Sequence, residues 1–247
     1  TSLLDEVDPK IAACGQCHNF MGAIYGRGVL MEKIQSGEVA VEDCDPYRYG
    51  TDPDSLMKAA LEDGYEMPVD EQTGIATFQA NHPEVEILQG SVHGSLGLTC
   101  PDCHMPQKTN DEGNTYVSHN ASSTPIENEE ALEFCLTCHS AQGIEDTEAM
   151  KNFVLAAEKE VADLETVFYD KQTQAHDLIA QATAEGGVDE NVLQEARDTY
   201  TRATWYVRYA DGGSEIKGQK VAHNPDMIKD YIERATVMMD DILAMLG

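Results

Sequence analysis

The stretch HPEVEILQGSVHGSLGLTCPDCHMP, residues 82–106, holds three histidines and two cysteines. Near its end lies Cys100-Pro-Asp-Cys103-His104, in which two residues separate the cysteines and a histidine follows at once. The same pattern occurs at Cys14-Gly-Gln-Cys17-His18 and at Cys135-Leu-Thr-Cys138-His139. The repetition of one spacing with the same residue types indicates a chemical role for these side chains.

The CxxCH pattern is the signature of covalent haem attachment in c-type cytochromes. Its two thiols reach the vinyl groups of one porphyrin, and the adjacent imidazole binds the iron. Cysteine pairs also bind zinc, and seven cysteines could form disulfides, but neither alternative requires a histidine after every pair. The sequence therefore predicts three haems, held by Cys14 and Cys17, Cys100 and Cys103, and Cys135 and Cys138, with His18, His104 and His139 as proximal ligands.

The remaining histidines are candidates for the second axial ligand of each iron. They are His82, His93, His119, His176 and His223. Three haems with two histidines each would use six of the eight histidines, and four haems would use all eight. A fourth haem could hang from the lone Cys44 by one thioether; the alternatives for Cys44 are a buried or free thiol, or half of an intermolecular disulfide. Methionine is another possible ligand, which would raise the reduction potential.

Composition supports a cofactor-filled interior and excludes some partners. Aromatic residues make up only 6% of the chain, and porphyrins can replace aromatic side chains in a core. A net charge of -29 opposes binding to nucleic acid and to anionic membranes. It is typical of solubility or life in salt, or else of a surface that meets cations or basic partners.

No apolar stretch is long enough for a membrane span, and the chain begins at Thr1 without a basic, then apolar, leader. We therefore expect a processed, exported protein, located outside the cell or at its surface, with the periplasm as the alternative.

The pattern of the chain predicts a mainly α fold in two regions around one set of cofactors. Residues 1–125 are rich in Gly, Pro and Asp and predict loops and short helices that wrap haem. Residues 126–247 predict long antiparallel helices, after a helix that starts at Thr124 and Pro125 and carries the third CxxCH. These long helices are expected at about 147–184, from Asp189 to about Ala210, and from Asn224-Pro225 to Leu246.

The two late histidines differ in their surroundings. His176 falls inside the long helix, where a lone histidine is more often solvated or hydrogen-bonded than a ligand. His223 directly precedes the last helix, and a helix start can fix the direction of an imidazole.

In this order the motifs resemble the multihaem cytochrome c nitrite reductases, in the region of their last three haems. The matching elements run along nearly the whole chain: Cys14–His18, Asn81–Glu84, His93-Gly94, Cys100–Pro106, His119, Cys135–His139, Ala175-His176, Trp205 and His223-Asn224-Pro225. The resemblance implies that His93, His119 and His223 are distal haem ligands. It also implies that His119 serves a haem whose attachment motif is absent, a place that a haem on Cys44 would fill.

The chain also departs from that family. The family's CxxCK motif, whose lysine leaves one face of the catalytic iron open, does not occur, and its catalytic tyrosine has no clear match in HNFMGAIYG. His82 lies where the family has its active-site histidine, and without an open iron it could become a ligand.

These departures favour a protein that transfers electrons and is not an enzyme. The chain is also similar to extracellular cytochromes that polymerise head-to-tail into conductive filaments, so we expect other copies of itself as partners, together with redox donors and acceptors. The alternatives are a discrete soluble carrier and a reductase of nitrite or a related nitrogen or sulfur oxyanion with one open haem iron.

Overall fold

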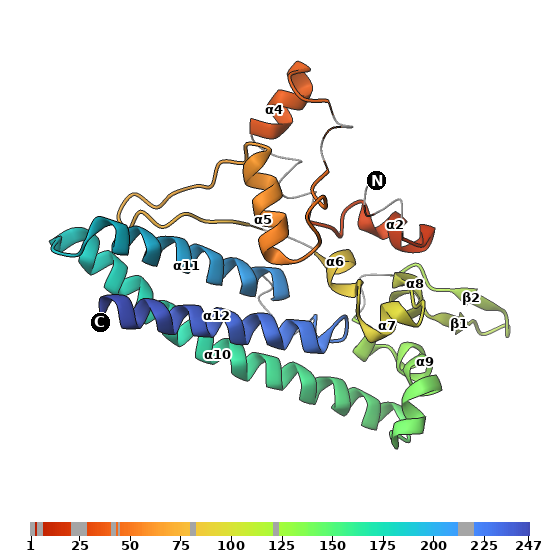
Figure 1. The fold of residues 1–247 in the computed structure, drawn as a ribbon. Coiled ribbons are helices and arrows are strands. Elements are labelled where there is room, and N and C mark those ends of the chain that lie inside the picture. The colour runs from red at the N-terminus through yellow and green to blue at the C-terminus, as the bar shows by residue number, and fades with distance from the viewer. Residues whose placement is uncertain are drawn as a thin grey trace.

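The computed structural model describes residues 3, 7–20, 29–40, 43, 45–79, 83–120, 124–211 and 220–247. The fold is mainly α, as predicted, with short helices in the first half and long ones in the second (Figure 1). The short helices are α2 (Pro9–Gly15), α4 (Val29–Ser36), α5 (Pro53–Glu62), α6 (Glu84–Leu88), α7 (Val92–Ser95) and α8 (Cys100–His104). None of the described helices is long and apolar enough to cross a membrane.

Three long helices lie side by side and form the body of the protein. They are α10 (Thr147–Glu185), α11 (Glu190–Asp211) and α12 (Pro225–Leu246), which agree closely with the predicted ranges. Asp146 starts α10 by accepting a hydrogen bond from the Ala149 amide at 2.8 Å. Gly186 ends it with a φ of 70°, which reverses the chain into α11.

The apolar faces of these helices form the main core. Their residues repeat at helical spacing, for example Val161, Phe168, Ala175 and Ile179 on α10, all fully buried. Aromatic contacts join this core to the first half of the chain. The Phe78 ring packs edge-on against the Trp205 ring, with ring centroids 4.6 Å apart. The Trp205 indole also donates a hydrogen bond of 2.7 Å to the carbonyl of Pro53 at the start of α5.

The helix that carries the third CxxCH begins later than predicted. Pro125–Glu127 forms only a 3-10 turn, η2, and α9 follows at Glu129–His139, with a second 3-10 turn, η3, at Ser140–Gln142. Asn128 separates η2 from α9 because its backbone is extended, with a φ of -115°, and its side chain accepts from the Ala131 amide. Asn128 is therefore the cap that Thr124 was expected to provide.

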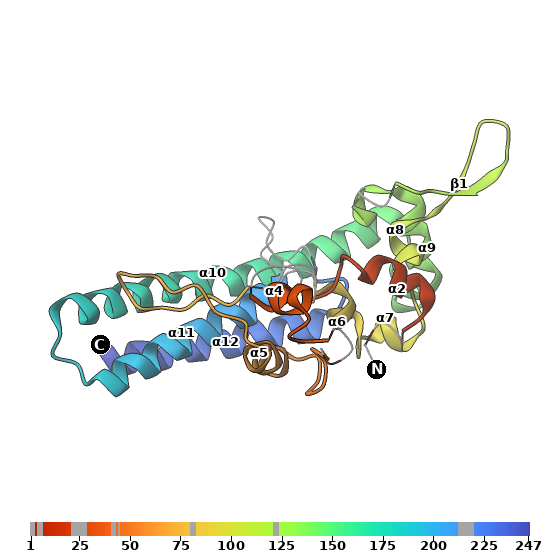
Figure 2. The same cartoon turned by 90° about the horizontal axis from the view of Figure 1, so that it is seen from above.

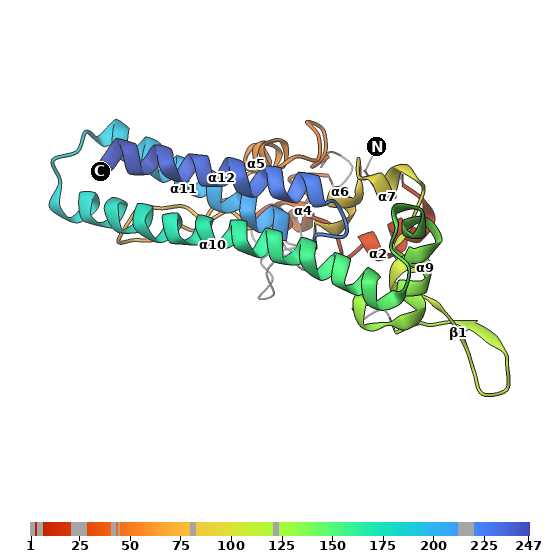
Figure 3. The ribbon, with the colours of Figure 1, turned by 90° about the horizontal axis from the view of Figure 1, so that it is seen from below.

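A small hairpin was not predicted. Strands β1 (Gln107–Thr109) and β2 (Thr115–Val117) pair antiparallel, with Lys108 opposite Tyr116. Figures 2 and 3 show this hairpin projecting away from the bundle.

The helices with the CxxCH motifs gather at one end of the bundle, opposite the C-terminus (Figure 1). Helix α8 contacts both α2 and α9, and α9 contacts the start of α10. A second, small apolar cluster of Ile11, Val85 and Leu88 underlies this end, with Cys100 packed against it. Among the described residues, the motif-bearing part therefore buries few apolar side chains of its own, as expected of a region built around a cofactor.

Candidate functional site

The three CxxCH motifs lie close together: the first begins at Cys14 in the last turn of α2 and continues beyond that helix, the second forms α8, and the third ends α9. The thiols of Cys14 and Cys100 interact with each other, and Cys103 and Cys135 lie close enough for their charges to interact. None of the six described motif cysteines forms a disulfide. Burial, with the neighbouring thiols, raises the pKa of Cys100 to about 12 and that of Cys103 to about 11, so the isolated thiols stay protonated.

Two pairs of histidines face each other beside these motifs. His104 of the second motif lies opposite His223, with ring centroids 6.1 Å apart and planes inclined by 20°. His139 of the third motif lies opposite His93, with centroids 6.2 Å apart and planes inclined by 64°. A metal-bound imidazole nitrogen lies about 2 Å from its ion, and the ring centre about 1 Å further, so two rings on opposite sides of one ion have centroids about 6 Å apart. Both separations therefore fit one iron between the rings.

Hydrogen bonds fix which nitrogen of these rings is available to a metal. His93 Nδ1 lies 2.9 Å from the Ala222 carbonyl, and His223 Nδ1 lies 3.2 Å from the Lys220 carbonyl. Because a carbonyl only accepts, Nδ1 carries the proton in both rings and the Nε2 lone pair is left for the metal. In the same way, His139 Nδ1 lies 3.2 Å from the side-chain oxygen of Gln142.

Electrostatics keep the His104–His223 pair neutral. Burial, together with the neighbouring His104, lowers the pKa of His223 to about 4. Burial and the nearby His18 lower the pKa of His104. Neutral imidazole is the form that binds metal, so both rings are prepared for ligation at neutral pH.

The residues around the two pairs also fit haem rather than a bare metal ion. Within the described residues, no three or more His, Cys, Asp or Glu side chains gather as a zinc site requires. Large apolar side chains are instead exposed beside the pairs: Val92 and Leu96 flank His93, with 71% and 66% of their surface accessible. Phe153 is also exposed, and its ring lies 5.7 Å from that of His139. A flat porphyrin would cover these surfaces.

The other predicted ligands lie in different places. His18 is exposed at the end of the first motif, with Nδ1 3.4 Å from Glu84 Oε2. His119 follows the hairpin and is also exposed, with Nδ1 3.0 Å from the Val117 carbonyl. Cys44 and His82 lie outside the described residues.

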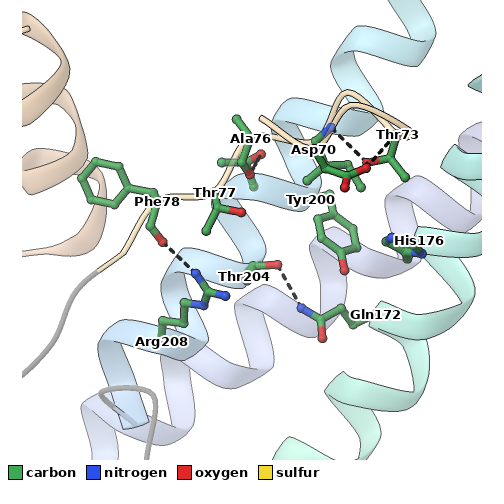
Figure 4. A pocket seen from close by; sticks show the side chains of 12 residues that line it. Asp70, Thr73, Ala76, Thr77, Phe78, Gln172, His176, Tyr200, Thr204 and Arg208 are labelled. Atoms are coloured by element: carbon green, nitrogen blue, oxygen red, sulfur yellow. Dashed lines mark hydrogen bonds between the residues drawn. The ribbon is translucent and has the colours of Figure 1, made fainter. Parts of the chain in front are cut away.

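His176 is remote from the three motifs. It follows Phe153 by 23 residues on α10, which corresponds to about 35 Å along the helix axis. It instead lines a cavity of about 330 Å³ between α10, α11 and the segment from Asp70 to Phe78 (Figure 4). Its ring lies 6.2 Å from that of Tyr200. A ligand role at one of the three CxxCH haems does not fit this position.

Two site residues were not assigned a role from the sequence. Glu84 on α6 pairs with Lys220, and the Lys220 main chain accepts the hydrogen bond from His223. Burial opposes ionisation of Glu84, but Lys220 outweighs this effect and holds the pKa of the carboxyl below its usual value. Glu84 was visible within the NHPE segment, whereas no sequence signal separated Lys220 from the other lysines.

Comparison with known proteins agrees with this geometry. The family model for cytochrome c552 matches residues 2–244. The chain belongs to the cytochrome c552 family. Haem c is therefore its cofactor, as the CxxCH motifs predicted, and iron, haem and electron transport belong to its chemistry.

A solved structure has the same fold. It is a cytochrome c nitrite reductase from Desulfovibrio desulfuricans, whose catalytic subunit has two calcium sites. The TM-score is 0.67 at 23% sequence identity, over 82% of this chain and 43% of that one. The chain thus spans less than half the length of the protein it resembles, and the predicted resemblance to nitrite reductases is confirmed at the level of family and fold.

One conclusion of the sequence analysis was wrong. The missing CxxCK motif favoured a filament subunit that transfers electrons and is not an enzyme, but the match to the cytochrome c552 family and the likeness to a cytochrome c nitrite reductase favour the reductase alternative over that reading. The ordered agreement of the other motifs outweighs the absence of CxxCK from this sequence. Head-to-tail contact between copies is untested by these comparisons and stays a prediction.

Proposed function

We propose that this chain works in the reduction of nitrite, or of a related nitrogen or sulfur oxyanion, and that its residues hold the haems that carry electrons to the reacting iron. The observation that supports this proposal is the presence of two opposed histidine pairs, His104 with His223 and His93 with His139, beside adjacent CxxCH motifs. The cytochrome c552 family and the fold of a nitrite reductase supply the reaction class.

The contacts between the motifs and the histidines support one assignment of residues to haems. Cys100 and Cys103 would attach the haem between His104 and His223, and Cys135 and Cys138 the haem between His139 and His93. Cys14, Cys17 and His18 would hold a third haem, whose second ligand we leave to the predicted set of distal histidines. Each bound haem would supply a one-electron couple.

At the two opposed pairs, the protein would block substrate access to the iron and would hold successive haems next to one another. A histidine on each side would leave no position for a substrate, so His104 with His223 and His93 with His139 would hold haems that relay electrons, and the oxyanion would react elsewhere. Helix α8 contacts both α2 and α9, and Cys100 and Cys103 lie near Cys14 and Cys135, so haems attached to these cysteines would be neighbours. Electrons would therefore cross short gaps from one haem to the next.

The number of haems is a further part of the proposal. Three haems follow from the three CxxCH motifs, and a fourth on Cys44, with His82 or His119 among its ligands, is the predicted candidate for an additional centre. Intact mass of the denatured holoprotein distinguishes three covalent haems from four, and Cys44→Ala should remove one haem only in the second case.

The surroundings of the protein also belong to the proposal. We propose a periplasmic location, with a redox protein as electron donor and the oxyanion as acceptor. The strong negative charge of the chain favours a donor with a basic docking surface.

The test is the reoxidation of the reduced holoprotein. The protein is purified with its haems, reduced anaerobically with a viologen, and mixed with nitrite or, separately, sulfite. We expect rapid, saturable reoxidation by at least one of the two oxyanions, with formation of a reduced product. A protein whose haems stay reduced with both oxyanions, yet are oxidised at once by ferricyanide, would be a carrier and would refute the proposal.

A further inference from the structure

One ion pair connects the ligands of two neighbouring haems. Glu84 Oε2 lies 3.4 Å from His18 Nδ1 of the first motif, and Glu84 Oε1 pairs with the ammonium of Lys220. The Lys220 carbonyl in turn lies 3.2 Å from His223 Nδ1, opposite His104 of the second motif. Glu84 and Lys220 therefore connect a proximal ligand of one haem to the distal ligand of the next, with Lys220 reaching His223 through its main-chain carbonyl.

Both charges are well shielded from water. Only 18% of the Glu84 side chain and 12% of the Lys220 side chain are exposed. Charges in such surroundings are screened much less by salt than charges on the surface. Their effect on a nearby iron should therefore persist at physiological ionic strength.

The position of Glu84 determines the direction of its effect. A carboxylate beside the outer nitrogen of a metal-bound histidine accepts its proton in a hydrogen bond, fixes the ring and makes the imidazole a stronger electron donor. A stronger donor ligand and a nearby negative charge both stabilise the ferric state. Glu84 should thus lower the reduction potential, whereas the positive charge of Lys220 should raise it.

We propose that Glu84 is a positioning residue that orients His18 and lowers the reduction potential of the haem held by Cys14 and Cys17, and that Lys220 limits this effect. The proposal depends on haem binding at the first motif but not on nitrite reduction. Its failure and that of the proposed function are therefore distinguishable.

The simpler alternative is a purely structural ion pair that ties α6 to the segment before α12. A structural pair predicts that removal of either partner loosens the same contact and has the same kind of effect. The electrostatic role instead predicts shifts of opposite sign. The Lys220 substitution is informative because His223 is held by the main chain of Lys220, which any side-chain replacement retains.

The experiment compares Glu84→Gln, Lys220→Met and the double variant as holoproteins. Potentiometric titration followed by haem absorption gives the midpoint potentials, and the haem content is checked beside it. We expect Glu84→Gln to raise at least one potential and Lys220→Met to lower it. The midpoint potential of the double variant should lie between those of the two single variants, and closer to the wild-type value than that of Glu84→Gln.

A second ion pair on the long helices provides the matched control. Lys171 on α10 pairs with Asp240 on α12, 2.5 Å apart, and Asp240→Asn makes the same charge change as Glu84→Gln far from the motifs. We expect no shift in this control. Shifts of the same sign in Glu84→Gln and Lys220→Met, or none, would overturn the proposal. If Glu84→Gln fails to load haem, the test depends on Lys220→Met. A midpoint potential of Lys220→Met below that of the wild type supports the proposal, and any other result refutes it.

Discussion

The imidazole ring of His93 faces that of His139 with the two planes inclined by 64°. The planes of His104 and His223 are inclined by only 20°. The mutual angle of two axial imidazoles sets how the d orbitals of a low-spin ferric iron are split. The two closed haems of this chain should therefore differ spectroscopically although their ligands are chemically identical.

We expect these two haems to give two distinct low-spin EPR signals in the oxidised holoprotein, beside that of the haem on the first motif. The nearly parallel pair, His104 and His223, should give a rhombic signal, and the strongly crossed pair, His93 and His139, a more anisotropic one with a higher maximum g value. His93→Ala should remove the second signal and leave the first. If both signals persist in this variant, the pairing of His93 with His139 is incorrect.

Replacement of His223 by methionine should raise the potential of one haem. Methionine is a weaker donor to ferric iron than histidine, and axial ligands tune haem over a range of about 0.8 V, so a rise of roughly 0.1 V or more is expected. The matched control is His176→Met, because His176 lies about 35 Å along α10 from the residue that contacts His139. Potentiometric titration should show a shift in the first variant and none in the second.

The sequence predicted the proximal half of the site well because covalent attachment requires a fixed local spacing. CxxCH identifies cysteines and a histidine within five residues, and no tertiary information is needed. The boundaries of α10, α11 and α12 were predictable for a similar reason, since Asp146, Gly186 and Asn224 act on the helix ends directly beside them.

The histidine that pairs with each proximal ligand could not be predicted from local sequence. His93 and His139 are 46 residues apart, and His104 and His223 are 119 apart, so spacing alone could not pair them. The resemblance to nitrite reductases named His93 and His223 as distal ligands, but it did not reveal Lys220 or Gln142, which act through a carbonyl and a side chain at the outer nitrogen. The remoteness of His176 likewise depends on the length and direction of α10.

The docking of α5 on the bundle depends on Asp54. Its carboxylate accepts hydrogen bonds from Arg202 Nε at 2.7 Å and from the Tyr206 hydroxyl at 2.7 Å. Burial opposes ionisation of Asp54, but these hydrogen bonds outweigh it and hold its pKa below 3.8. Because the group is partly exposed, Asp54→Asn should cost only about 1 kcal/mol of unfolding free energy at pH 7.

This contribution should vanish in acid. A carboxyl whose pKa is lower in the folded state stabilises the protein fully above its unfolded value and loses this effect as the pH falls through the folded pKa. Urea unfolding at pH 7 and pH 3 gives the unfolding free energies of wild type and Asp54→Asn. The difference between these two free energies should be smaller at pH 3. Asp230→Asn, in an exposed pair with Arg234, is the control and should change little at either pH.

Glu86 should have the opposite dependence on pH. Its side chain is fully buried and accepts hydrogen bonds from the Phe20 amide at 2.7 Å and the Tyr47 hydroxyl at 2.6 Å. Burial raises its pKa from 4.5 to about 7 despite these hydrogen bonds. Between these two values the folded protein keeps a proton that the unfolded chain releases, so stability falls as the pH rises through this window, by about 3 kcal/mol in all.

Glu86→Gln tests this dependence, because glutamine keeps the acceptor oxygen for Phe20 and Tyr47 but never ionises. We expect the variant to lose the decline in stability between pH 5 and pH 8, and to be more stable than the wild type at pH 8. Urea unfolding followed by helical circular dichroism gives both numbers. Glu195→Gln, at an exposed position of α11, removes the same charge and should keep the wild-type slope. If the unfolding free energy of Glu86→Gln changes with pH as steeply as that of the wild type, Glu86 is ionised in the folded protein over this whole pH range. Its oxygens would then accept from a stronger donor than the Tyr47 hydroxyl and the Phe20 amide.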